Sequence, residues 1–431
     1  MRYARRVLGI FLFIFSTIVN GQQFSKDTFT LTLHQADSIL ISRNLLLLAE
    51  KCNINATKAL IIQAGVFNNP SLTVNQNVYN TEYQINGGRK WFDFSNNGET
   101  NLQIEQLFFL AGKRNKRIKL AKLTADREES VYFDLVRSLK YSMRNGFYNI
   151  YFLGKIIAVY DKEIASLSKL ISVATEEYEK GYFSKKELLR LKSMLFALEN
   201  EKLGYKTQRI TAQNEFNVFM RTENMFYIPL PNKEPIDSLS FLELKLEPLV
   251  DTAYQHRYDL KTVQSDLQIS QVNLSYQKSL AVPDFTLSGG WDRNGSYVHN
   301  YNFIGLQIDL PVFNRNQGNI RSAISDIEAG KYKLQGMEYR VKADVLESYA
   351  SALETNNLYN KFDNKFTTDL DRLMEEMLSN YEKKNISLIE FLDYYDAYKQ
   401  NAVQVNNLLY NRVIAFENIN YSVGKNVLPI K

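Results

Sequence analysis

The sequence is poor in the residues that build cofactor and catalytic sites. Of its 431 residues only one is cysteine, Cys52, and three are histidines. A single cysteine excludes a disulfide within the chain. His34, His256 and His299 lie far apart, without the cysteine or carboxylate spacing of a zinc site. The phosphate-binding, nucleophile-elbow and paired-histidine motifs of common enzyme families are also missing, so we expect no metal, no cofactor and no enzymatic activity.

Neither sign of charge dominates the chain. Lysine and arginine number 52 and aspartate and glutamate 47, which gives a formal net charge of +5. The basic residues are spread along the chain, whereas a nucleic-acid-binding protein gathers them on one face. We therefore expect no nucleic-acid partner.

Long apolar runs are scarce, and the one at the N-terminus is short. Arg2, Arg5 and Arg6 precede an apolar run at 7–19, whereas a transmembrane helix needs about 20 apolar residues. This pattern is typical of a secretory signal peptide, which we place at 1–21. An uncleaved membrane anchor is the weaker interpretation, and no cysteine lies near the cleavage site to accept a lipid.

Proline is rare, and its positions leave room for two sets of long helices. The eight prolines leave 71–228 and 312–428 uninterrupted, and a proline would break a helix interior. Apolar residues recur at alternating spacings of three and four, which is the seam of a coiled coil. We therefore predict a helical hairpin in each tract. The first outbound helix, 113–179, would hold 67 residues and extend about 100 Å.

The chain contains an internal two-fold repeat of about 200 residues. The tripeptide Tyr-Glu-Lys at 178–180 recurs 203 positions later, and matching serine and glutamate residues follow each copy. Pro70 and Pro283 open corresponding segments upstream. The predicted divisions after the signal peptide are a first repeat at 22–221, an inter-repeat segment at 222–247, a second repeat at 248–424 and a C-terminal tail at 425–431.

Four segments of about ten residues alternate apolar and polar side chains, as strands with one apolar face do. In the second of them the alternation slips at Gln106. The candidate lumen-facing residues on the polar faces are Gln103, Glu105, Gln307 and Asp309. Length and alternation fit a transmembrane β-barrel, although a half-buried sheet of a soluble protein has the same local pattern. Pairing of the segments into two hairpins, one per repeat, favours the barrel.

Four strands cannot close a membrane barrel, because the smallest known barrels have eight and an open edge leaves unsatisfied backbone groups in lipid. Other copies of the chain must therefore supply the missing strands. Three chains would contribute twelve strands, and their helical hairpins would continue the barrel as a tube of about 100 Å. The predicted fold class is an α+β membrane protein that forms a hollow conduit.

Four motifs occur in order along nearly the whole mature chain. They are Leu-Thr-Leu-His-Gln-Ala at 31–36, Asn-Pro-Ser-Leu at 69–72, Gly-Lys-Arg at 112–114 and Leu-Pro-Val-Phe-Asn-Arg-Asn-Gln-Gly at 310–318. In their order, spacing and duplication they resemble the TolC-like outer-membrane efflux proteins. The third motif and the asparagine-rich turn most resemble the branch that serves heavy-metal and multidrug pumps.

This resemblance implies a homotrimer in the outer membrane of a Gram-negative bacterium, in contact with outer-membrane lipid. Its twelve-stranded β-barrel would continue into a periplasmic α-helical barrel. The implied partners are a periplasmic adaptor, or membrane fusion protein, and an inner-membrane transporter of the RND type. The chain would be a passive conduit for drugs or metal ions. The alternatives are an outer-membrane duct for type I protein secretion and a secreted coiled-coil scaffold or adaptor without a pore.

The resemblance also assigns a role to the two predicted helical turns, because family members contact the adaptor through such hairpin tips. The candidate adaptor contacts are Lys180, Gly181, Tyr182 and Ser184 at the first tip and Lys384, Asn385 and Ser387 at the second. Gly181 permits a left-handed backbone. At the second tip Lys384 replaces the glycine that the family often has, and Asn385 tolerates the left-handed region. We therefore expect the turn to be kept, with different contact chemistry.

Three acidic residues match positions at the periplasmic entrance of family members. The i, i+3 spacing of Glu390 and Asp393 puts both carboxylates on one helix face, and three-fold symmetry would gather six of them in a ring that attracts cations. A solvated helix face without a role in the lumen is the alternative. Glu187 matches the acidic half of a clamp that closes the entrance in some members. Ile386 occupies the position of the clamp arginine, so closure is expected to use other contacts; the alternative is that Lys383 or Lys384 substitutes for the arginine.

Six basic residues without an acidic one follow the second strand-like segment. They are Lys113, Arg114, Lys116, Arg117, Lys119 and Lys122. Near the expected membrane surface they would contact acidic lipid groups or line the tube, and a solvated helix start is the simpler interpretation. The asparagine- and glycine-rich segment at 81–98 is expected to be an external loop.

Overall fold

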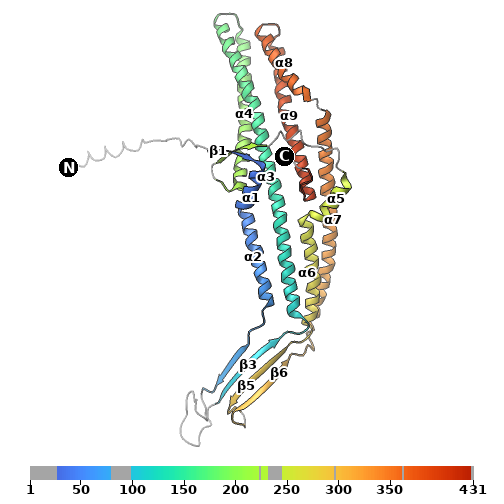
Figure 1. Cartoon of the computed structure of the whole chain (residues 1–431). Coiled ribbons are helices and arrows are strands. Elements are labelled where there is room, and N and C mark those ends of the chain that lie inside the picture. The colour runs from blue at the N-terminus through green and yellow to red at the C-terminus, as the bar shows by residue number, and fades with distance from the viewer. Residues whose placement is uncertain are drawn as a thin grey trace, which may run out of the picture.

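A sheet of four strands lies at one end of the molecule and two helical turns at the other, with long helices between them (Figure 1). The computed structural model describes residues 27–78, 99–222, 225–231, 245–295, 298–361 and 364–428. The predicted signal peptide, the segment at 81–98 and the larger part of the inter-repeat segment lie outside the described residues. The strands are β1 (Asp27–Thr32), β2 (Ser71–Gln76), β3 (Thr100–Phe108), β4 (Met225–Leu230), β5 (Phe285–Arg293) and β6 (Tyr301–Ile308).

In the described residues four helices precede β4 and five follow it. They are α1 (Leu33–Arg43), α2 (Leu45–Gly65), α3 (Lys113–Glu179) and α4 (Lys185–Met220), then α5 (Leu246–His256), α6 (Tyr258–Leu280), α7 (Gln317–Lys361), α8 (Asn364–Glu382) and α9 (Leu388–Val423). The prediction of one unbroken helix at 113–179 is confirmed, since α3 has 67 residues. In the described part of the chain, no helix has both the length and the apolar character that a bilayer crossing needs.

Four of the strands form one antiparallel sheet in the order β2-β3-β5-β6. Each half supplies one hairpin, and the pairing of β3 with β5 joins the two hairpins edge to edge. In this register Leu72 lies opposite Ile104, then Gly289, then Ile304. A separate parallel pair joins β1 to β4.

One face of the four-stranded sheet is apolar and exposed. Ile104 and Ile304 lie on this face and are 54% and 86% exposed. The alternation does not slip, because β3 stays in register with β5 through Phe108. The predicted slip at Gln106 is therefore wrong. Gln106 lies on the apolar face near the strand end, and its side-chain amide donates a hydrogen bond to the carbonyl of Asn68 at 3.0 Å.

The helices form a layer with α3 near its middle (Figure 1). α3 packs against α2 and α4 and also against α6 and α9. α7 packs against α6 and α9, and α8 packs against α9. The helices α2 and α4 therefore form one edge of the layer, and α7 and α8 form the other.

A buried apolar cluster, here called the tip cluster, holds the two helical hairpins of the chain together. It consists of Ile156, Tyr160, Leu167, Leu170, Ile171, Ala174, Leu188, Leu191, Leu198, Leu388, Phe391 and Tyr395. These residues come from α3, α4 and α9. Burying a large apolar side chain contributes about 1.5–3 kcal/mol, so the tip cluster makes the two hairpins one packed unit.

Both helical turns use the same backbone motif. At the first turn the N–H of Tyr182 donates to the carbonyl of Glu177 at 2.9 Å, and that of Gly181 donates to Tyr178 at 3.0 Å. Gly181 has a φ of 80°. This pair of hydrogen bonds with a left-handed residue is a Schellman motif, which satisfies the last carbonyls of a helix.

The second turn repeats this motif with a lysine in the left-handed position. The N–H of Asn385 donates to Asn380 at 2.8 Å, and that of Lys384 donates to Tyr381 at 2.9 Å. The turn is kept, but Lys384 and not Asn385 adopts the left-handed conformation, with a φ of 60°. That conformation costs a residue with a side chain about 1–2 kcal/mol, so packing around the turn must offset the strain.

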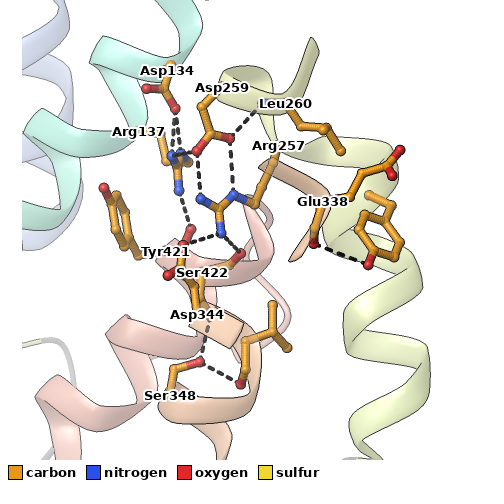
Figure 2. A network of polar contacts seen from close by, with 12 residues as sticks. Asp134, Arg137, Arg257, Asp259, Leu260, Glu338, Asp344, Ser348, Tyr421 and Ser422 are labelled. Atoms are coloured by element: carbon orange, nitrogen blue, oxygen red, sulfur yellow. Dashed lines mark hydrogen bonds and ion pairs between the residues drawn. The ribbon is translucent and has the colours of Figure 1, made fainter. Parts of the chain in front are cut away.

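An ion-pair network ties four helices together near the middle of the molecule (Figure 2). Arg257, between α5 and α6, donates to Asp259 at 2.6 Å and to Asp344 of α7 at 2.8 Å. Arg137 of α3 also contacts Asp259, at 3.2 Å, and donates to the backbone carbonyl of Tyr421 in α9 at 2.7 Å. The side chain of Arg257 is only 4% exposed.

The network sets the protonation of its central carboxylate. Burial alone would raise the pKa of Asp259, but its hydrogen bond with Arg257 and the charges of Arg137 and Arg257 outweigh burial and hold the pKa below its usual value. A carboxyl whose folded pKa is depressed stabilises the fold above its unfolded pKa and loses that contribution as pH falls through the folded pKa. The network therefore stabilises the fold at neutral pH.

Substitutions at the two left-handed turn positions should have opposite effects on the stability of the turns. Gly181→Ala introduces a Cβ at positive φ, and Lys384→Gly removes one, so the former should weaken and the latter strengthen its turn by up to about 1 kcal/mol. Hydrogen exchange at the tip amides measures both. Gly204→Ala is the control, because Gly204 lies inside α4 without a positive φ, and alanine should stabilise that helix. Slower exchange at the first tip in Gly181→Ala would contradict the assignment.

Neutralising the central carboxylate should destabilise the protein. Asp259→Asn leaves the buried guanidinium of Arg257 without its main counter-charge, which should lower the free energy of unfolding by about 2–3 kcal/mol at pH 7 and by less at an acidic pH below the lowered pKa of Asp259. Denaturant unfolding at both pH values provides the measurement. Glu376→Gln is the matched control, since its pair with Arg372 is exposed and should contribute less than about 0.5 kcal/mol. Equal losses for both variants would disprove the role of the network.

Candidate functional site

The predicted lumen-facing residues of the strands lie on the polar face of the sheet. Gln103 and Glu105 occupy adjacent positions of that face on β3 and are hydrogen-bonded to each other. Gln307 lies on the same face of β6, opposite Thr286. Asp309 follows the end of β6, and its carboxylate accepts a hydrogen bond from Gln307 at 3.5 Å. The structure therefore brings all four to one face, which can hydrogen-bond to water and polar solutes.

Two glycines leave room on the polar face for neighbouring side chains. The ring of Phe303 lies over Gly290, where a Cβ would meet it at 2.6 Å. A Cβ at Gly305 would likewise overlap the hydroxyl of Ser288. Both glycines thus let neighbouring side chains lie flat across the sheet.

The predicted contacts of the first tip are exposed to solvent. Tyr182 is 72% exposed, and Ser184 precedes α4 without making a side-chain cap. Lys180 lies 3.8 Å from Glu177 in an exposed ion pair. These side chains surround the left-handed Gly181 and leave it open, since no atom lies within 4 Å of where its Cβ would be.

The second tip has the same shape, with different polar groups. Lys384 and Asn385 are exposed, and the amide of Asn385 donates to the side chain of Asn380 at 3.4 Å. Ser387 is the N-cap of α9, where its hydroxyl accepts from the N–H of Glu390 at 3.2 Å. Ser387, one of the predicted adaptor contacts, therefore also caps the start of α9.

The acidic residues near the tips differ in their surroundings. Glu390 and Asp393 lie exposed on α9, as their spacing predicts. Glu187, in the first turn of α4, is half-buried. Burial raises the pKa of Tyr381 to about 12, and the negative charge of Glu187 adds to this effect. The charge of Glu187 thus affects a side chain, Tyr381, of the other helical hairpin.

The predicted change at the entrance clamp concerns Ile386 and Glu187. Ile386 occupies the arginine position and packs against the tip cluster. No ion pair joins Glu187 to a lysine or arginine among the described residues. The expectation that closure uses contacts other than this clamp stays a prediction.

A polar link between α4 and α9 was not found by sequence reasoning. Glu201 of α4 accepts hydrogen bonds from the hydroxyl of Tyr160 at 2.8 Å and from Lys399 of α9 at 3.2 Å. Lys399 also contacts Asp396 at 3.0 Å. Nothing in the sequence links residues 201 and 399, because only the packing of the two hairpins brings them together.

The basic stretch at the start of α3 is partly used inside the protein. Lys113 is buried and donates to the carbonyl of Val282 at 2.7 Å, beside an ion pair with Asp284. Arg114 donates to the carbonyl of Gly65 at 2.7 Å, and Arg117 donates to Ala64 at 3.3 Å. The last two cap the C-terminus of α2. The interpretation of the whole stretch as a solvated helix start is therefore wrong for these three residues.

Within the described ranges, no group of three or more histidine, cysteine, aspartate or glutamate side chains has the arrangement of a metal site.

The arrangement of strands and helices matches that of known outer-membrane channels. No protein-family model matches the chain. The cobalt-zinc-cadmium resistance protein CzcC of Cupriavidus metallidurans is 24% identical over 303 residues, which are 68% of this chain and 66% of that protein. The alignment thus spans just under two thirds of the relative's length.

Solved structures show the likeness of fold over nearly the whole chain. CusC superposes with a TM-score of 0.74 at 12% identity, over 91% of this chain and 92% of the other. The outer-membrane protein VceC of Vibrio cholerae superposes with a TM-score of 0.70 at 14% identity, over 91% and 96%. At this level of identity the likeness is one of fold, shared with a protein named as an outer-membrane protein. The comparisons confirm the resemblance to the TolC-like outer-membrane efflux proteins, and the chain has the fold of these channels.

Proposed function

We propose that three copies of this chain form the outer-membrane duct of a tripartite efflux system, which passes small molecules from the periplasm to the outside. The duct performs no chemistry. Its cargo is drugs or metal ions, in keeping with a relative that is named a cobalt-zinc-cadmium resistance protein.

The observation that carries this proposal is that both edges of the sheet are open. Among the described residues, β2 pairs only with β3 and β6 pairs only with β5. An open edge with an apolar face cannot persist in lipid, because its backbone N–H and C=O groups have no water to bond. Pairing of β6 of one copy with β2 of the next satisfies both edges, and three copies give a barrel of twelve strands.

Each edge of the helical layer carries an exposed apolar stripe, near the tips on α4 and nearer the sheet on α7 (Figure 1). On α4 the side chains of Leu189, Phe196, Leu203 and Ile210 recur every seven residues and are 45–73% exposed. On α7 the side chains of Tyr332, Tyr339 and Leu346 recur at the same interval and are 50–69% exposed. A seven-residue apolar stripe is the seam by which one helix packs on another.

The two edges differ from each other, which determines the kind of assembly. A contact between two different surfaces of identical chains is heterologous, and it closes into a ring when the rotation between copies allows. The sheet and the helices then close around one axis. The polar strand face, with Gln103 and Glu105, lines the lumen of this ring.

The hairpin tips form the periplasmic end of the duct. We assign the adaptor contact to the exposed residues around Gly181 and Lys384, and the inner-membrane transporter, of RND type, acts through that adaptor. Three copies of Glu390 and Asp393 form an acidic ring near the entrance, which attracts cations. Glu187 contributes to closure through Tyr381 and the tip cluster.

Charges placed on the α4 stripe should prevent assembly. Phe196→Glu with Leu203→Glu would put two carboxylates into an apolar interface, at a cost of several kcal/mol, so the detergent-solubilised protein should migrate as a monomer in native gels where the wild type migrates as a trimer. Val173→Glu is the control, because Val173 is 51% exposed on α3, away from the layer edges. Trimers of the charged variant, or a wild type that is monomeric and soluble without detergent, would contradict the proposal.

Loss of the chain should sensitise its host to toxic small molecules. A deletion strain is expected to accumulate cobalt, zinc or cadmium ions, or drugs, and to stop growing at lower concentrations than the parent. The wild-type chain and Val173→Glu should restore growth, whereas the α4 stripe variant should not. Unchanged growth on metals, drugs and detergents together with loss of a secreted protein would instead identify a type I secretion duct.

A further inference from the structure

An apolar and basic surface lies at the end of the sheet where strands meet helices. We call it the junction belt and define it by Phe67, Leu110, Leu310, Phe313, Arg315, Lys119 and Lys122. Its apolar members are strongly exposed, with Leu310 at 76% and Phe313 at 92%. Leu310 continues the alternation of β6 and so lies on the apolar side of the sheet. The belt therefore extends the lipid-facing surface toward the helices.

The two lysines of the belt lie on this same side of the molecule. Phe108 is on the apolar face, so alternation places Phe109 on the polar side, where the guanidinium of Arg117 lies 5.0 Å from its ring centre. At 100° per residue, Lys119 and Lys122 are about 200° and about 140° from Arg117 around α3. Both therefore point away from the polar side.

The direction of the helix also turns these lysines toward the sheet. Helical side chains lean toward the N-terminus of their helix, and α3 begins at the sheet. Lys119 is six residues, or about 9 Å, from the start of α3. Its flexible stem can thus carry the ammonium group back to the membrane surface, as snorkelling lysines do.

The charges of the belt lack counter-charges. Lys119, Lys122 and Arg315 are exposed, and none of them forms an ion pair with another described residue. No acidic residue occurs between positions 109 and 122, and the nearby Asp284 is already paired with Lys113 at 2.7 Å. A surface with apolar side chains beside unpaired cations is complementary to a layer of anionic headgroups over acyl chains.

We propose that the junction belt binds the headgroups of anionic phospholipids in the periplasmic leaflet of the outer membrane. This inference rests on the proposed function, which puts the sheet in that membrane. Lys119, Lys122 and Arg315 bind the phosphates, while Phe313 and Leu310 lie among the upper acyl carbons. The belt thereby sets the depth at which the duct sits in the bilayer.

Lipid retention by the purified protein tests this proposal. The detergent-solubilised protein is mixed with equal amounts of phosphatidylglycerol and phosphatidylcholine, and bound lipid is counted by native mass spectrometry. The wild type should bind more phosphatidylglycerol than phosphatidylcholine. In a variant with Lys119→Gln, Lys122→Gln and Arg315→Gln, the ratio of the two bound lipids should fall about fivefold for each residue changed. The preference of the wild type should also fall as salt is raised.

The matched control removes the same charge from a distant part of the surface. Lys331, Lys333 and Lys342 are exposed on α7, and the nearest of them is about 21 Å from its start, beyond the screening length of about 8 Å. Their change to glutamine should leave the preference intact. An equal loss in the control, or a wild type without preference or salt dependence, overturns the proposal. Insertion into vesicles of phosphatidylcholine separates the outcomes, since failure to insert counts against the proposed function itself.

Discussion

Backbone hydrogen bonding at the edges of a four-stranded sheet is the constraint on which this molecule depends. Each strand presents N–H and C=O groups on two sides, and β2 and β6 use only one side within the described chain. In water such an edge invites aggregation, and in lipid it is not tolerated. The apolar face of the same sheet leaves lipid as the fitting environment. The proposed ring of three chains follows from this constraint. The helical layer also has two open edges, and the same ring would close them.

The helices meet a different requirement, which is to keep a long, thin layer rigid. A layer one helix thick has little interior, so its stability depends on local clusters and on polar contacts between neighbours. The tip cluster joins the two hairpins at one end, and the network of Arg257, Asp259 and Arg137 joins four helices in the middle. At the other end Lys113, Arg114 and Arg117 bind backbone carbonyls where helices end and strands begin. These three points of attachment align the tips with the strands.

Much of this architecture could be predicted from local patterns. The absence of proline and the regular apolar spacing were enough to give the bounds of α3, because helix formation depends on neighbours within one or two turns. Alternation predicted the shared face of Gln103, Glu105 and Gln307 for the same local reason. Gln106 was misjudged because a polar residue can lie on an apolar face when it is near a strand end, where a free carbonyl such as that of Asn68 accepts its hydrogen bond. Whether Glu390 and Asp393 line an entrance is a property of the assembly and stays a proposal.

The sequence by itself determined the elements, their repetition and the polarity of each surface, since these follow from residue preferences over short distances. Only the tertiary structure decided which polar groups serve the fold and which stay exposed. Lys113 and Lys119 stand six positions apart in one basic stretch, yet the first is buried where it contacts Val282 and Asp284, between α6 and β5, and the second stays at the surface. Likewise Glu201 and Lys399 meet only because the two hairpins pack together. Such contacts depend on the distance between residues in space, which cannot be deduced from their separation along the chain.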